Sequence, residues 1–96
     1  MSVVAQIKSK RGQILNIASQ HGVNKVKIFG SALRGEETPE SGIDLLVECK
    51  DECSLFDLIG LKQELEQMFG RKINIVTPNS IHWSLQESIL REAQEI

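Results

Sequence analysis

The apolar residues at the start of the chain have the spacing of a helix. Apolar residues recur every three or four positions in a stripe made of Val4, Ile7, Ile14, Ile17 and Ala18. This stripe predicts one amphipathic helix over residues 4–20, with Gly22 as a C-terminal stop. The period then changes to two in residues 25–29, where lysines alternate with apolar residues, and this alternation predicts a half-buried strand.

A second strand is expected at residues 43–48. Alternation places Ile43, Leu45 and Val47 on one of its faces, and the other face is made of Asp44, Leu46 and Glu48. Between the two strands, residues 32–34 predict a short helical turn. Residues 36–41 contain Pro39 and predict a loop.

The second half of the chain repeats the pattern of helix and strand. Ser54 is expected to cap a helix, with Asp57 completing a capping box, and Gly70 is expected to end it. The helical stripe consists of Leu58, Leu61, Leu65 and Met68. A third strand is expected at residues 72–76, and Asn79 or Ser80 is expected to cap a last helix that runs through Trp83, Ile89, Leu90 and Ala93.

This order of elements predicts an α/β (α+β) fold, in which helices pack on a small, mixed, three-stranded sheet that an extra edge strand could extend. The 96 residues are expected to form a single domain, residues 1–96. The chain has three Phe, one Trp and no Tyr, so a mainly aliphatic core is expected.

Charge and targeting signals narrow the function. The net charge of −2 argues against a surface for bulk nucleic-acid binding. No apolar run is long enough for a membrane span, and the first residues do not form a secretory signal, so a cytoplasmic location is expected. In that compartment Cys49 and Cys53 are expected to be two reduced thiols.

The stretch from Gly30 to Asp44 carries the candidate chemistry. It reads G-S-A-L-R-G-E-E-T-P-E-S-G-I-D. Gly30 would let the backbone approach a ligand closely, and the N–H groups of the following turn could bind an anion such as phosphate. Ser31 adds a hydroxyl donor, and Arg34 offers a planar fork for a phosphate oxygen. Without more context, a tight turn beside a solvated arginine is the commoner interpretation.

The whole stretch resembles the signature of the DNA polymerase β-like nucleotidyltransferase superfamily, and specifically of its smallest branch, the minimal nucleotidyltransferases (MNT). The family pattern is Gly-Ser, then Arg-Gly, a loop, and Ser-Asp-x-Asp at the start of a strand. This chain matches it with Gly30, Ser31, Arg34, Gly35, Ser41 and Asp44. The resemblance implies binding of a nucleoside triphosphate, ATP in the first instance, with Gly30, Ser31, Arg34 and Ser41 as nucleotide-binding residues.

The resemblance also implies an activity and a partner. The two aspartates of the pattern, with a third carboxylate from a later strand, hold two Mg²⁺ ions for in-line transfer of a nucleotidyl group to a protein or other hydroxyl. Family members of this size pair with a helical HEPN protein as the antitoxin of a toxin–antitoxin system. Asp44 is therefore expected to be a catalytic and metal-binding residue.

The chain departs from the pattern at two metal positions. Gly42 stands where the first aspartate is expected, and Asn74 stands where the third carboxylate is expected. Because Mg²⁺ depends on carboxylate charge, and losing one catalytic group costs about 10²-fold or more in rate, weak or absent transfer is expected. Rescue by loop carboxylates remains an alternative, and the candidates are Glu36, Glu37 and Glu40.

Three functions therefore stay open. The chain is an active nucleotidyltransferase antitoxin, a non-catalytic binding module that masks a partner, or a pseudoenzyme subunit that needs another chain to complete a site. A homodimer is a further possibility. An exposed apolar patch on the last helix is the expected partner surface.

Other polar and aromatic residues have ordinary interpretations. His21 and His82 are expected at a helix end and in a loop or helix, and Trp83 in the core or an interface. Lys25 and Lys27 are expected to face solvent on an edge strand. Solvated helix positions are expected for Glu64, Glu66, Glu92 and Glu95.

Overall fold

The computed structural model describes residues 3–35, 42–51 and 53–96. Ten elements follow one another in these residues: α1 (Val3–Ser9), α2 (Arg11–Gln20), β1 (Val23–Phe29), α3 (Ser31–Arg34), β2 (Ile43–Cys49), α4 (Leu55–Phe69), β3 (Ile73–Val76), the 3₁₀ turn η1 (Pro78–Ser80), α5 (Trp83–Glu92) and β4 (Gln94–Glu95). The predicted α/β class is confirmed.

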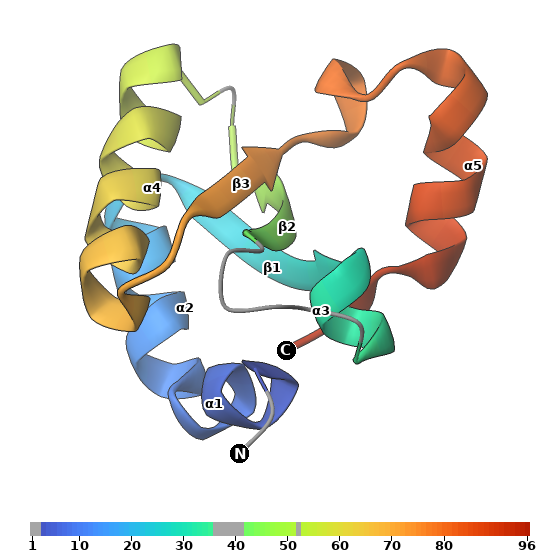
Figure 1. Cartoon of the computed structure of the whole chain (residues 1–96). Helices are drawn as coiled ribbons and strands as arrows, with labels where there is room; N and C mark the ends of the chain where they lie inside the picture. The colour runs from blue at the N-terminus through green and yellow to red at the C-terminus, as the bar shows by residue number, and fades with distance from the viewer. Residues whose placement is uncertain (1–2, 36–41, 52) are drawn as a thin grey trace.

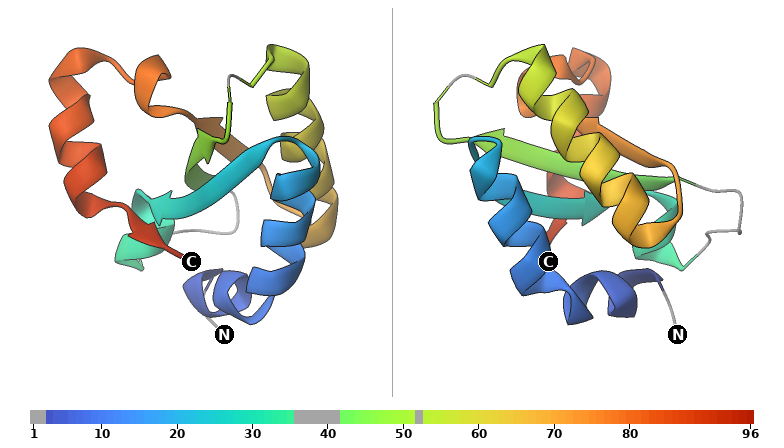
Figure 2. Two further views of the ribbon diagram at one scale, coloured as in Figure 1. Left: turned by 180° about the vertical axis from the view of Figure 1, so that it is seen from behind. Right: turned by 90° about the vertical axis from the view of Figure 1, so that its left-hand side faces the viewer.

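The sheet has four strands in the order β3-β2-β1-β4. β1 runs antiparallel to both β2 and β4, whereas β2 and β3 are parallel. α2 and α4 lie on one side of the sheet and α5 on the other (Figures 1 and 2). The extra edge strand is β4, which covers β1 at Lys27 and Ile28, so the predicted edge position of Lys27 is wrong.

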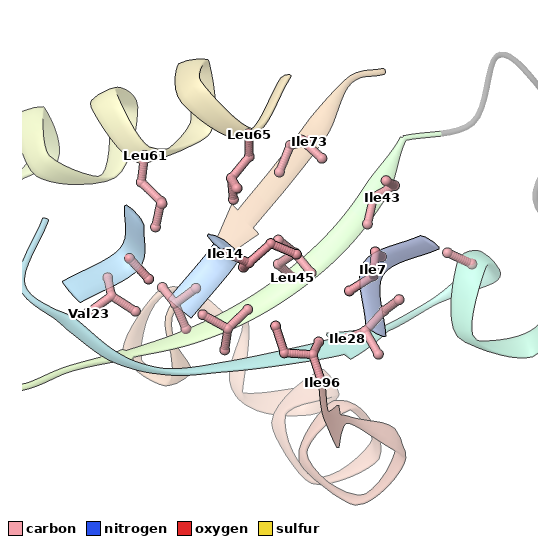
Figure 3. Packing of buried hydrophobic residues seen from close by; sticks show 14 of the residues in the cluster. Ile7, Ile14, Val23, Ile28, Ile43, Leu45, Leu61, Leu65, Ile73 and Ile96 are labelled. Atoms are coloured by element: carbon pink, nitrogen blue, oxygen red, sulfur yellow. The ribbon is translucent and has the colours of Figure 1, made fainter. Parts of the chain in front are cut away.

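The core lies between the sheet and the helices α1, α2 and α4. Ile43, Leu45 and Val47 of β2 join it with Leu61 and Leu65 of α4, all almost fully buried. Figure 3 shows the two leucines pointing from α4 toward the sheet. The buried side chains are aliphatic, as the composition predicts. On the other face of β2, Leu46 is also buried, whereas Asp44 is only half-buried.

α4 has the ends that the sequence predicts. The Ser54 hydroxyl accepts a hydrogen bond from the Asp57 N–H, and the Asp57 carboxylate accepts one from the Ser54 N–H. Gly70 ends the helix in the left-handed conformation, with φ of 62°. The last helix begins differently, because His82 rather than Asn79 or Ser80 caps α5, and its Nδ1 accepts a hydrogen bond from the Ser84 N–H.

The single N-terminal helix predicted from the apolar stripe is wrong. The chain turns at Lys10, where ψ is 16°, and two helices result. The change of direction (Figure 2) lets both halves of the stripe reach one core, because Ile7 of α1 and Ile14 of α2 are both buried there. In the first turn of α1, Val3 is buried and Val4 only partly so. Periodicity alone could not show this bend, since it keeps the same spacing on both sides of Lys10.

The prediction of two reduced thiols is also wrong. Cys49 and Cys53 form a disulfide with their Cα atoms 5.8 Å apart, which is within the usual span. The end of β2 and the approach to α4 bring the two residues together. The prediction rested on the expected compartment and not on this geometry. Among the described residues, no helix is long and apolar enough to cross a membrane.

Candidate functional site

The turn after β1 is built around a glycine that touches the next strand. Gly30 is buried and has φ of 79°, and a Cβ there would lie 2.3 Å from Asp44 Oδ2. The antiparallel register that sets Phe29 opposite Asp44 produces this approach. Ser31, half-buried, then starts α3, and Arg34 ends it on the protein surface. The predicted Gly-Ser turn and Asp44 are therefore neighbours.

Asp44 is paired with Asn74 across the sheet. The parallel register of β2 and β3 sets the two residues side by side. Asn74 Nδ2 donates a hydrogen bond of 3.0 Å to Asp44 Oδ1. The place where a third carboxylate was expected thus holds an amide that donates to the remaining acid.

Gly42 lies beside Asn74 as well. A Cβ on Gly42 would lie 2.7 Å from Asn74 Nδ2 and 3.3 Å from the Lys72 carbonyl oxygen. The three positions at which the family pattern expects carboxylates, 42, 44 and 74, therefore converge in this structure. Asp44 is the only carboxylate among those three residues.

These three residues do not fit a site for two Mg²⁺ ions. Such ions need several carboxylate oxygens in near-octahedral geometry, and Asp44 already accepts a hydrogen bond from Asn74. Within residues 3–35, 42–51 and 53–96, no cluster of three or more His, Cys, Asp or Glu could hold a metal ion. Four residues named from the sequence lie outside the described residues, namely Ser41, Glu36, Glu37 and Glu40.

Arg34 meets a residue from the other end of the chain. Its Nη1 lies 2.5 Å from Oε1 of Glu92, at the C-terminal end of α5. The prediction that Glu92 is merely solvated is therefore wrong. Glu64 is exposed on α4 as predicted, and its pairing with His21 was not predicted. Glu66 is only half-buried and accepts a hydrogen bond from the Ile73 N–H, so the prediction is wrong for it. Sequence spacing carries no signal for the Arg34–Glu92 contact, because the residues are 58 positions apart.

Two helices carry large exposed apolar side chains. On α5, Trp83 is 79% exposed, so its predicted core position is wrong and its predicted interface position remains a prediction. The last helix exposes three large apolar side chains, Trp83, Leu85 and Leu90, but the helical period puts Leu85 on the opposite side from the other two, so a single patch remains a prediction. A second group, which was not predicted, lies at the start of α4 and consists of Leu55, Phe56 and Ile59.

The amino-acid sequence is similar to those of known nucleotidyltransferases. A family model described as polymerase beta, nucleotidyltransferase matches residues 12–96. A protein of Methanocaldococcus jannaschii, provisionally named a protein adenylyltransferase, is 43% identical over 93 residues, which cover 97% of each chain. Protein adenylyltransferase MntA of Thermococcus cleftensis is 32% identical over 76 residues, which cover 79% of this chain and 77% of the relative.

Solved structures agree with these relatives. A structure provisionally described as a minimal nucleotidyltransferase superimposes with a TM-score of 0.86 at 33% identity, over 100% of this chain and 97% of the other. A toxin–antitoxin complex with AMP-PNP shares the fold, with a TM-score of 0.73 at 19% identity, over 88% of this chain and 69% of the other. On the sequence signature, the fold and these matches, the chain belongs to the polymerase β nucleotidyltransferase family and to its minimal branch.

Proposed function

We propose that this chain binds a nucleoside triphosphate, ATP in the first instance, and that it transfers nucleotidyl groups weakly or not at all. The observation that carries the proposal is the Asn74–Asp44 hydrogen bond, which lies where the family pattern places a pair of carboxylates. The proposed function has two parts, nucleotide binding and loss of transfer, and they rest on different residues.

Nucleotide binding rests on the turn after β1. Gly30 has a positive φ and no side chain, which lets the turn pack against Asp44 and start α3 beside it. The Ser31 hydroxyl and the Arg34 guanidinium can both donate hydrogen bonds to phosphate oxygens. Ser41 would complete the set that the family resemblance implies. These groups bind a phosphate without requiring a carboxylate.

Loss of transfer rests on missing charge. Two Mg²⁺ ions, as the family resemblance implies, would be held by three carboxylates and would supply positive charge for the transfer. Gly42 offers no ligand atom, and Asn74 offers an uncharged amide that cannot act as a base. Removing one such group costs about 10²-fold or more in rate, and two losses at one site do not combine additively. Asp44 would remain to orient a ligand, while the groups that gather metal ions are absent from positions 42 and 74.

The biological role that we propose is the antitoxin of a HEPN/MNT pair. Support comes from relatives named protein adenylyltransferase, and from a solved neighbour described as an AMPylated HEPN toxin in complex with an MNT antitoxin. The exposed Trp83, Leu85 and Leu90 of α5 supply apolar area for a helical partner. With weak transfer, the chain would act mainly by covering its partner, which is the alternative function of a non-catalytic binding module.

The test separates the two parts. The purified chain is titrated with ATP by calorimetry, and then incubated with Mg²⁺ and labelled ATP, with and without the protein encoded beside it. We expect ATP binding, complex formation with the partner and little or no label on either protein. Efficient labelling of the partner by the unaltered chain would refute the loss of transfer, and no heat of ATP binding would refute the nucleotide site.

A further inference from the structure

Arg34, the predicted phosphate-binding arginine, already forms an ion pair with a carboxylate of the protein. Arg34 Nη1 lies 2.5 Å from Oε1 of Glu92, so a carboxylate faces the guanidinium in the free protein. Carboxylate and phosphate oxygens bind a guanidinium fork in the same way, through charge-assisted hydrogen bonds. A phosphate that approaches Arg34 must therefore compete with Glu92.

Glu92 belongs to a helix that has few other attachments. α5, which the structure describes in full, has no buried residue. Near its first turns, Gln86 Nε2 donates hydrogen bonds to the carbonyl oxygens of Pro78 and Ile81. At its other end, the chain continues into β4, and Ile96 reaches the core. The C-terminal end of α5 lies beside α3 (Figures 1 and 2), and the Arg34–Glu92 pair connects the two helices there.

We infer that Glu92 lowers the affinity of the site by occupying Arg34, and that a bound nucleotide phosphate displaces it and loosens the C-terminal end of α5. Glu92 thus lowers the affinity of the site for phosphate. It also couples phosphate binding to a loosening of α5, the helix that carries Trp83, Leu85 and Leu90. The inference rests on the proposed function, because it requires a nucleotide phosphate at Arg34.

The size of the effect follows from the exposure of the pair. The side chains of Arg34 and Glu92 are 48% and 27% exposed, so solvent screens their attraction. Ion pairs of this kind contribute about 0.2–1 kcal/mol, and removing the competitor should tighten phosphate binding by about 1.5- to 5-fold. The gain should shrink as salt is raised, because salt also weakens the pair.

The experiment compares Glu92→Gln with a matched control on the same helix. Glu87→Gln removes the same charge, but Glu87 pairs with Arg91 within α5 and not with Arg34. Glu92→Asp keeps the negative charge but shortens the side chain. It therefore shows how much of the effect comes from direct contact with Arg34 and how much from the charge alone. Affinities for ATP and for inorganic tripolyphosphate are measured by calorimetry, and hydrogen exchange over residues 83–92 is measured with and without ATP.

We expect Glu92→Gln to bind both ligands about 1.5- to 5-fold tighter, Glu92→Asp to gain part of this and Glu87→Gln to match the wild type. ATP should speed exchange in α5 of the wild type, and exchange in Glu92→Gln should already be fast without it. If ATP binds the wild type but Glu92→Gln and Glu87→Gln behave alike, or exchange in α5 does not respond, the inference is overturned and the proposed function stands. If no variant binds ATP, the proposed function fails and the inference fails with it.

Discussion

Asn74 Nδ2 donates a hydrogen bond of 3.0 Å to Asp44 Oδ1, across two parallel strands that set the residues in register. An aspartate at position 74 would bring a second negative charge beside Asp44, and that repulsion is what bound cations relieve in a metal site. The amide relieves it without a cation. The same pair thus explains how the fold keeps Asp44 in place and why we expect the site to hold few metal ions.

Restoring the missing acids should restore transfer. The double variant Gly42→Asp, Asn74→Asp places three carboxylates where the structure shows positions 42, 44 and 74 converging. We expect its Mg²⁺-dependent labelling of the partner protein by labelled ATP to exceed that of the wild type by about 10²-fold or more. Gly42→Asp alone should do less, because Asn74 would still offer an uncharged amide in place of the third carboxylate.

The control for this variant changes the same residue types on α2. Gly12→Asp, Asn16→Asp adds the same charge at exposed positions, where a Cβ on Gly12 meets nothing within 4 Å. It should label no better than the wild type. Equal labelling by the two double variants would mean that added charge, and not the restored site, accounts for the gain.

Gly30 should tolerate alanine less well than Gly35 does. Both have a positive φ, of 79° and 72°, but the backbone differs. Gly35 is in the left-handed helical region, where alanine costs about 1–2 kcal/mol, whereas ψ of −156° puts Gly30 in a region that is essentially restricted to glycine. At Gly30 the new Cβ would also lie 2.3 Å from Asp44 Oδ2, whereas at Gly35 it meets nothing within 4 Å. We expect Gly30→Ala to lower the free energy of unfolding in urea by about 1–3 kcal/mol more than Gly35→Ala. Equal losses would contradict both the backbone conformation at Gly30 and its close approach to Asp44.

The positions that form the site could be predicted from the sequence, but the long-range ion pair beside it could not. The signature placed Gly30, Asp44 and Asn74 together, because strand register follows from local alternation and from the resemblance. The ion pair between Arg34 and Glu92 was not predicted, because no local pattern connects residues 58 positions apart. The structure shows that positions 42, 44 and 74 converge, while the chemical roles of these residues remain predictions.

The errors in local structure have a common cause. The bend at Lys10 and the exposure of Trp83 both depend on where the sheet lies relative to the helices. Hydrophobic spacing shows which face of a helix is apolar, but not whether another element covers it. Among the described residues, Trp83, Leu85 and Leu90 of α5 are exposed, although apolar residues in a helix are also typical of a core helix.

The disulfide makes a chemical prediction. Denatured under non-reducing conditions, the chain should release no free thiol from Cys49 or Cys53, and reduction should release two. Because the bridge closes a short loop, with a sequence separation of 4, its loss in Cys49→Ser, Cys53→Ser should lower the free energy of unfolding by about 2 kcal/mol. Two titratable thiols before reduction would contradict the bridge.

Two leucines should differ sharply in their contribution to stability. Leu61 of α4 is 0% exposed within the core, and Leu85 of α5 is 54% exposed. We expect Leu61→Ala to cost about 2–5 kcal/mol in urea unfolding and Leu85→Ala to cost less than about 0.5 kcal/mol. Leu85→Ala should instead weaken the complex with the partner protein. A large loss of stability from Leu85→Ala would show that α5 packs on the sheet in solution.

Counting metal ions in the nucleotide complex tests the central claim most directly. The unaltered chain is saturated with a non-hydrolysable ATP analogue, and bound Mn²⁺ is titrated as a spectroscopic stand-in for Mg²⁺. With Asp44 tied to Asn74 and no side-chain ligand at Gly42, we predict at most one ion per chain, carried by the nucleotide phosphates. Two tightly bound ions per chain, one of them lost in Asp44→Asn, would contradict the claim.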